Sequence, residues 1–456
     1  MSKTGRGSGH GTTPVAPRFA GTVRVPPLSA PGALVMNKLL WLSVAAAALT
    51  TACAAPDDGN GKSAVPRPAA AAPRDEPAPA PVAAQPAPPP VPAPFTDAVA
   101  RAGERLLQDA QSAVGSGPRE LVIDPLIDSS SGQQTGGTVQ MGQQLTALIK
   151  TRVPAWNVKP LSRASLSSRP LLLIGTLTAI NTKNAKDQNA DAFRVCLVLI
   201  DLRSGKLIAK RVDRATLASV DAEPTALFRD APTWALDRTA LAYIKSCQGS
   251  SPGDNVDPGY LLRLPAAAVV NEAVIAFADN KPAEAYKLFH EAQPIADPDD
   301  LRILNGLYMT SWRTGKKKEA ADTFGKIVGL GIEAKSLPIK LFFNPGKTTL
   351  LQSADLRSQY AVWLRELAVQ VGARESCLKI VGHTSRTGDA AANVALSQKR
   401  ASLVKQTLER QNKKLSTRLT ADGVGSRETI IGLGTDDLRD ALDRRVEFRT
   451  VDCAAA

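Results

Sequence analysis

A short segment near the C-terminal end of the chain has the residue types of an anion-binding loop. From Gly382 to Gly388 it reads GHTSRTG, so two glycines enclose hydroxyl groups and a cation. The residues that follow predict a helix, on which Asn393 and Arg400 are seven residues, or two turns, apart and therefore lie on one face. A guanidinium in such a place can bind a carboxylate through two parallel hydrogen bonds. The pattern predicts a small pocket for an anionic group.

This segment resembles the motif of the OmpA-like peptidoglycan-binding family, which runs GHTDxxGxxxxNxxLSxxRA. Residues 382–401 read GHTSRTGDAAANVALSQKRA, in register throughout, and Ser385 replaces the family's aspartate. A second segment, DRRVEF at residues 443–448, is close to the family's closing strand, NRRVEF. The resemblance covers about residues 338–453. It implies a domain similar to the C-terminal domain of peptidoglycan-associated lipoproteins.

The resemblance also implies the ligand and the residues that would bind it. The ligand would be the diaminopimelate of the peptidoglycan stem peptide, with Arg400 on its carboxylate. Ser385 offers a neutral hydroxyl where the family has a charge opposite the ligand's ammonium, a loss on the order of 1–3 kcal/mol. Asp389 is a nearby acidic residue that could compensate. The implied peptidoglycan-binding residues are Thr384, Ser385, Gly388, Asn393, Leu396, Arg400, Arg444 and Arg445.

Alternating strand and helix patterns surround the motif and predict an α/β domain of βαβαβ type. Strands are expected at 339–343, 377–381 and 445–451, and a helix from 390 to about 410. A further helix at 353–371 begins at a serine and ends before a glycine, which are favourable capping residues.

Two further regions precede this domain. Residues 96–250 predict an α/β domain, loosely similar in fold to periplasmic domains of curli-secretion and wall-synthase-activating lipoproteins. Residues 260–335 predict a short tetratricopeptide-like helical region, because the segments at 280–285 and 315–320 repeat with a period of 35. Two such hairpins form either a connector packed on its neighbours or a groove for a protein partner. The elements expected in the α/β region are helices at 96–113 and 139–153 and strands at 120–126, 170–180, 193–202 and 207–212.

The N-terminal part resembles the leader of a bacterial lipoprotein. Residues 36–52 combine a lysine, an apolar run too short to span a bilayer and small residues before Cys53. The resemblance implies a signal peptide and a mature N-terminal cysteine carrying diacylglycerol and palmitate-like acyl chains, which anchor firmly. The alternative is an ordinary signal peptide cleaved before an incidental cysteine. Residues 1–35 are interpreted as a non-native upstream extension or a long leader, and the Pro/Ala-rich residues 53–95 as an extended tether.

Four cysteines remain after Cys53. An even number in an exported protein predicts two disulfides, for which three pairings exist. Pairing within predicted domains favours Cys196–Cys247 and Cys377–Cys453, and the alternative is free buried thiols.

Several functional classes are disfavoured. The cysteines and histidines lack metal-ligand spacing, and no nucleophile lies in a catalytic motif, so neither an enzyme nor a metal or cofactor is expected. Five of the cations behind the formal net charge of +13 lie in the first 52 residues, and only 4% of residues are aromatic. Nucleic-acid binding is therefore not expected.

These patterns favour an outer-membrane lipoprotein, facing the periplasm, that binds peptidoglycan noncovalently and tethers the outer membrane to the cell wall. The alternative is a periplasmic adaptor that recruits a wall-synthesis or export complex through residues 96–335. In that case the C-terminal domain would serve only for localisation.

Overall fold

The computed structural model describes residues 91–181, 190–233, 236–351, 354–430 and 439–453, together with 432, 434 and 436. The predicted upstream extension, signal peptide, Cys53 lipidation site and almost all of the tether lie outside these residues. The described residues belong to one compact unit.

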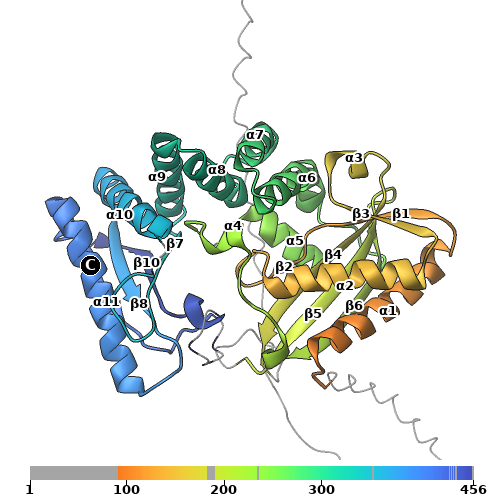
Figure 1. The fold of residues 1–456 in the computed structure, drawn as a ribbon, viewed down its shortest axis with the longest axis horizontal. Helices are drawn as coiled ribbons and strands as arrows, with labels where there is room; N and C mark the ends of the chain where they lie inside the picture. Colours follow the sequence, from red (N-terminus) through yellow and green to blue (C-terminus); the bar gives the residue numbers. More distant parts are fainter. Residues whose placement is uncertain are drawn as a thin grey trace, which may run out of the picture. The chain divides into compact units, whose positions relative to one another are not determined.

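The first sheet is mixed and lies in the region predicted as an α/β domain (Figure 1). Its strands are β1 (Arg119–Ile123), β2 (Ile127–Asp128), β3 (Trp156–Pro160), β4 (Leu171–Ile180), β5 (Ala192–Asp201) and β6 (Lys206–Thr216). Their order is β3-β1-β4-β5-β6, and β2 pairs with β4 beside this path. The pairs among β1 to β4 are parallel, whereas β4, β5 and β6 are antiparallel neighbours.

Helices cover both faces of this sheet. On one face lie α1 (Phe95–Val114) and α2 (Gly136–Arg152), and on the other lie α5 (Arg238–Gln248) and α6 (Pro258–Ala278). Along β4, Leu171 and Leu173 belong to the first core and Leu172 and Ile174 to the second. This alternation follows from the two-residue period of a strand. The sequence of a strand that is buried on both faces is therefore a continuous apolar run, as in β4.

The predicted strand at 120–126 corresponds to β1, which ends at Ile123 before Asp124 and Pro125, and β2 begins only at Ile127, beyond the predicted range. Proline has no backbone N–H to donate to a ladder, which explains the break. The sequence interpretation also missed β3 and α5, as well as two short helices, α3 (Arg163–Leu166) and α4 (Ala226–Arg229).

The helical region consists of α6, α7 (Pro282–Ala292), α8 (Leu301–Arg313) and α9 (Lys317–Glu333). Its apolar residues share one core with the C-terminal domain. In that core Trp363 Nε1 donates to the Tyr308 hydroxyl at 2.6 Å, and that hydroxyl donates to Gln359 Oε1 at 3.0 Å. Helix α6 is long and apolar enough to cross a membrane by length and composition alone, but more than half of it is buried inside the protein. This burial is typical of a core helix and favours the connector interpretation.

The C-terminal sheet has the order β7-β10-β8-β9. Its strands are β7 (Leu337–Phe342), β8 (Cys377–Gly382), β9 (Leu419–Gly423) and β10 (Arg445–Val451). The two long helices of this domain are α10 (Ala354–Ala373) and α11 (Ala390–Gln411). Strand β10 is antiparallel to β7 and β8, and β8 is parallel to β9. The predicted α/β class is confirmed, but β9 was missed because LTADG is short and lacks an apolar alternation.

One of the two predicted disulfides forms. Cys377 and Cys453 are bonded, with their Cα atoms 5.1 Å apart. The predicted Cys196–Cys247 bridge does not form in this structure, and both residues are free and buried. Their sulfur atoms lie 2.7 Å apart, because Cys196 on β5 faces Cys247 on α5.

Candidate functional site

The motif loop joins the end of β8 to the start of α11, and glycines make this junction possible. A Cβ on Gly382 would lie 2.0 Å from Ser397 O, and one on Gly423 would lie 2.3 Å from Gln398 N. Side chains at these positions would push α11 away from the strand ends. Gly388 has a φ of +87°, a conformation that favours glycine. The backbone geometry therefore explains why glycines enclose the loop.

Arg400, which the sequence predicted to bind the carboxylate of the ligand, is fully buried at 0% exposure. Its guanidinium donates to the carbonyl oxygens of Lys347, His383 and Asn344, each at 3.0 Å. It also lies over the ring of Phe343, 5.1 Å from the centroid. Burial lowers the pKa of Arg400 to about 10. In this structure Arg400 fastens the loop after β7 to the motif loop, which the sequence interpretation did not foresee.

A carboxylate lies directly beside the serine that replaces the family's aspartate. Ser385 Oγ donates to Asp436 Oδ1 at 2.9 Å and contacts Thr387 Oγ1 at 3.1 Å. Arg444 Nη1 donates to the same Asp436 oxygen at 3.0 Å. The side chain of Asp436 is 35% exposed, whereas that of Arg444 is 3% exposed. A carboxylate is thus present near position 385, although it comes from elsewhere in the chain and is paired with Arg444.

Asp389, the acidic residue considered as compensation, has a different role. Its Oδ1 accepts from Ala392 N at 2.8 Å and caps the first turn of α11. No spacing rule connects Asp436 with Ser385, since 51 residues separate them. The only sequence signal at Asp436 is its place in a polar, glycine-containing loop.

The other predicted residues are distributed around this point. Asn393 Nδ2 donates to Thr387 O at 2.9 Å and so shapes the loop. Thr384 is buried, and its Oγ1 has no hydrogen-bond partner within the described part of the chain. Leu396 is half-buried. Among the described residues, Arg445 does not bond to the motif loop through its side chain but donates through Nε to Glu447 Oε2 at 3.0 Å.

His383 lies beneath the loop, where it is fully buried beside Glu447, with Nε2 and Oε1 3.4 Å apart. Burial lowers the pKa of His383. Burial alone would raise the pKa of Glu447, but His383 and Arg445 outweigh this effect and hold it well below its usual value. Potential metal-ligand atoms of His383, Glu428 and Glu447 lie within 4.8 Å of one another. Glu447 and Glu428 already pair with arginines, so this cluster is neutralised within the protein.

Residues 342–441 match the OmpA family model. The C-terminal part of the chain is an OmpA-like domain, as the motif predicted. No curated protein matches the chain in sequence.

Solved structures similar to part of the chain include the peptidoglycan-associated lipoprotein from Burkholderia pseudomallei. That pair has 23% identity and a TM-score of 0.22, covering 25% of this chain and 89% of the other. The cell wall anchor of the T6SS from Pseudomonas aeruginosa has 18% identity and a TM-score of 0.21, with 28% and 97% covered. The periplasmic domain of Helicobacter pylori MotB (residues 78–256) has 18% identity and a TM-score of 0.20, with 25% and 71% covered.

Proposed function

We propose that this protein binds peptidoglycan noncovalently through its OmpA-like domain, at the motif loop, and that the ligand is the diaminopimelate of the stem peptide. The observation that carries this proposal is the Asp436 carboxylate between Ser385 and Arg444. It supplies the negative charge whose absence from the motif was the main argument against binding.

The chemistry of the ligand explains why both signs of charge matter. The free end of diaminopimelate is an amino-acid group with an ammonium and a carboxylate. An ammonium needs acceptors, which Asp436 and the hydroxyls of Ser385 and Thr384 offer. A carboxylate needs donors, and we assign this role to Arg444, which lies beside Asp436, and to the backbone N–H groups of the loop. Arg400 holds the loop in place through its hydrogen bonds, and its buried positive charge also favours an anionic group at the loop.

We further propose that the protein is anchored to the outer membrane through a lipidated Cys53 and tethers that membrane to the wall. The support is the sequence of residues 36–53 and the proline-rich residues that follow. An extended tether of some forty residues reaches at most on the order of 130 Å. Replacing Cys53 with serine should abolish acyl labelling and move the protein out of the membrane fraction. Unchanged labelling would contradict the lipid anchor.

The binding proposal is tested by sedimentation of the purified, unlipidated protein with insoluble peptidoglycan. The expected result is saturable retention that free diaminopimelate reverses. A peptidoglycan whose stem peptide carries lysine instead of diaminopimelate is the matched control, because it has the ammonium but lacks the adjacent carboxylate. Equal retention on both polymers, or no effect of free diaminopimelate, would contradict the proposed ligand.

A further inference from the structure

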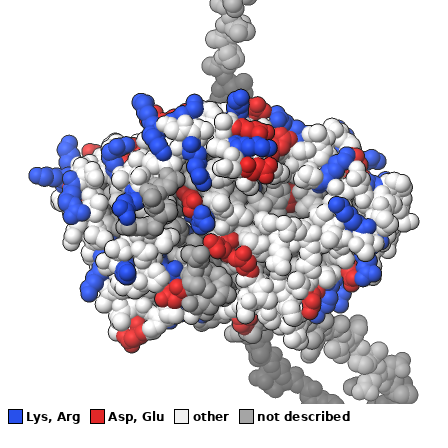
Figure 2. Space-filling view, in the orientation of Figure 1, with Lys and Arg blue, Asp and Glu red and all other residues white. Residues whose placement is uncertain are grey.

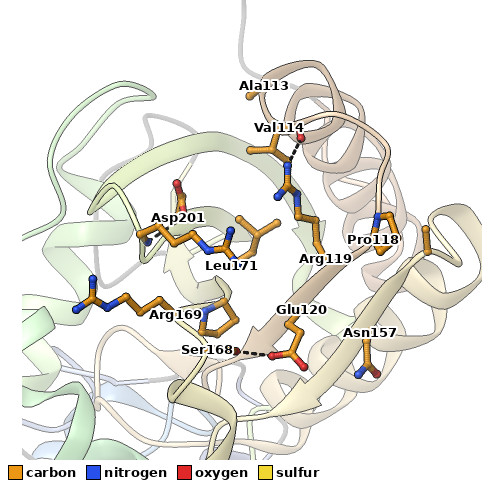
Figure 3. A pocket seen from close by; sticks show the side chains of 13 residues that line it. Ala113, Val114, Pro118, Arg119, Glu120, Asn157, Ser168, Arg169, Leu171 and Asp201 are labelled. Atoms are coloured by element: carbon orange, nitrogen blue, oxygen red, sulfur yellow. Dashed lines mark hydrogen bonds between the residues drawn. The ribbon is translucent and has the colours of Figure 1, made fainter.

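A hollow of about 680 Å³ opens at one end of the first sheet. It is lined only by residues between Ala113 and Arg203, so it lies outside the OmpA-like domain. The end of α1, the first residues of β1, β3 and β4, and the turn after β5 form its walls. Figure 3 shows Arg169 and Asp201 on the side of the hollow opposite Pro118 and Arg119. This volume is within the range of small-molecule sites.

Three arginines and two acidic residues line the hollow, so cations outnumber acids in its lining. The side chains of Arg169 and Arg203 are exposed and have no hydrogen-bond or ion-pair partner among the described residues. Arg119 donates through Nη2 to Val114 O at 2.7 Å, while its buried Nε has no partner in the described part of the chain. Figure 2 shows that Lys and Arg side chains occur at many places on the visible face.

The two acidic residues of the lining are already occupied. Glu120 pairs with Lys159 and accepts a hydrogen bond from Ser168. Asp201 accepts from Arg203 N at 3.0 Å and from Ser204 Oγ at 2.9 Å, which closes the turn after β5. Only Glu120 is paired with a cation, whereas the donors to Asp201 are neutral and leave its charge in place. Three guanidinium groups against one such carboxylate give the hollow a net positive charge, and guanidinium groups suit planar carboxylates and phosphates.

The backbone at Arg169 adds an independent observation. Its φ is +50°, in the left-handed region, where glycine is the usual residue. The next residue is Pro170, which disfavours helical conformations at the residue before it. An arginine nevertheless occupies this strained position on the rim. Strain of this kind is concentrated at binding and active sites.

We propose that this hollow binds a small organic anion with at least two carboxylate or phosphate groups. Arg169, Arg203 and Arg119 contact the anionic groups, and the apolar part lies against Val114, Pro118 and Leu171. This site is separate from the motif loop, and its test does not depend on peptidoglycan binding.

The test is calorimetric titration of the purified full-length protein, at low ionic strength, with citrate and separately with fructose 1,6-bisphosphate, an organic bisphosphate. One saturable site is expected for at least one of the two anions, and which one binds identifies the anionic group. The double variant Arg169→Gln/Arg203→Gln should weaken binding at least tenfold. The control, Arg105→Gln/Lys150→Gln, removes two exposed cations from α1 and α2 outside the lining and should change affinity less than twofold.

Arg169→Gly separates binding from folding, since glycine tolerates the positive φ. We expect an unchanged or higher melting temperature together with weaker binding. Failure of both anions to bind, or equal losses in the double variant and its control, would overturn the proposal.

Discussion

The hydroxyl of Ser385 donates to the carboxylate of Asp436 at 2.9 Å, and the guanidinium of Arg444 donates to the same oxygen at 3.0 Å. A residue 51 positions away thus brings a negative charge to the place where the family motif has an aspartate and this chain has a serine. Charge at this site depends on tertiary structure rather than on the motif alone.

Asp436→Asn should weaken retention on peptidoglycan, because a neutral amide replaces a charged acceptor for the ligand's ammonium. Hydrogen bonds to charged groups contribute about 1.5–3 kcal/mol, which corresponds to roughly a tenfold to a hundredfold loss of affinity. Retention is measured by the sedimentation assay with diaminopimelate-containing peptidoglycan.

Ser385→Asp in the Asp436→Asn background is the matching rescue, since it restores one carboxylate at the same place. Asp452→Asn changes the charge equally at an exposed residue of the same domain and should leave retention unchanged. Tighter binding by Asp436→Asn would mean that Asp436 occupies the ligand's carboxylate position and competes with it.

Arg400→Ala should destabilise the OmpA-like domain as well as weaken binding. The substitution removes three hydrogen bonds to backbone carbonyls and leaves those carbonyls without their donors inside the protein. The expected loss in the free energy of unfolding is roughly 3 kcal/mol or more. Urea unfolding measures it, with Lys399→Ala, an exposed neighbour, as the control. Parent-like stability would show that the loop does not depend on this guanidinium.

Removing the Cys377–Cys453 bridge by a double serine substitution should also lower stability. Its sequence separation of 76 residues corresponds to about 4 kcal/mol in the chain-entropy account. Mass mapping without reductant should find this bridge, and Cys196 and Cys247 should be alkylated only after unfolding, because both are buried. A native Cys196–Cys247 crosslink would contradict the free pair.

Asp124 should make stability depend on pH. It is 2% exposed, and burial raises its pKa from 3.8 to about 6. The unfolded chain loses this proton near pH 4 and the folded chain only near pH 6, so the free energy of unfolding should fall as the pH rises through this window. The fall amounts to roughly 3 kcal/mol.

Asp124→Asn should lack that component, because the amide does not titrate and its oxygen can still accept from the Tyr260 hydroxyl. Urea unfolding of both proteins at pH 4 and pH 7 isolates the Asp124 contribution, since other carboxyl groups are common to both. Parallel pH curves would contradict the assignment.

The elements predicted well from sequence are those whose pattern is local. Long apolar runs predicted β4 and β5, and periodic segments predicted α10 and α11 within a few residues, although α10 continues through Gly372, where it was expected to end. Strands β3 and β9 were missed because WNVKP and LTADG carry little apolar signal, and their pairing depends on β1 and β8.

At the candidate site, too, local features were predicted from sequence and features that depend on tertiary structure were not. The motif correctly located the loop between β8 and α11, but motif spacing cannot tell whether a guanidinium faces a ligand or backbone carbonyls. In the structure the guanidinium of Arg400 donates to backbone carbonyls instead. The position of Asp436 could not be predicted because it depends on how a distant loop returns to Ser385.

The hydrogen bond between Trp363 on α10 and Tyr308 on α8 has a mechanical consequence. Because the two helices share a core, a pull on the C-terminal sheet is transmitted directly into the helical region. A fragment cut between α9 and β7 would expose apolar surface on both pieces. The two regions should therefore resist load as one body.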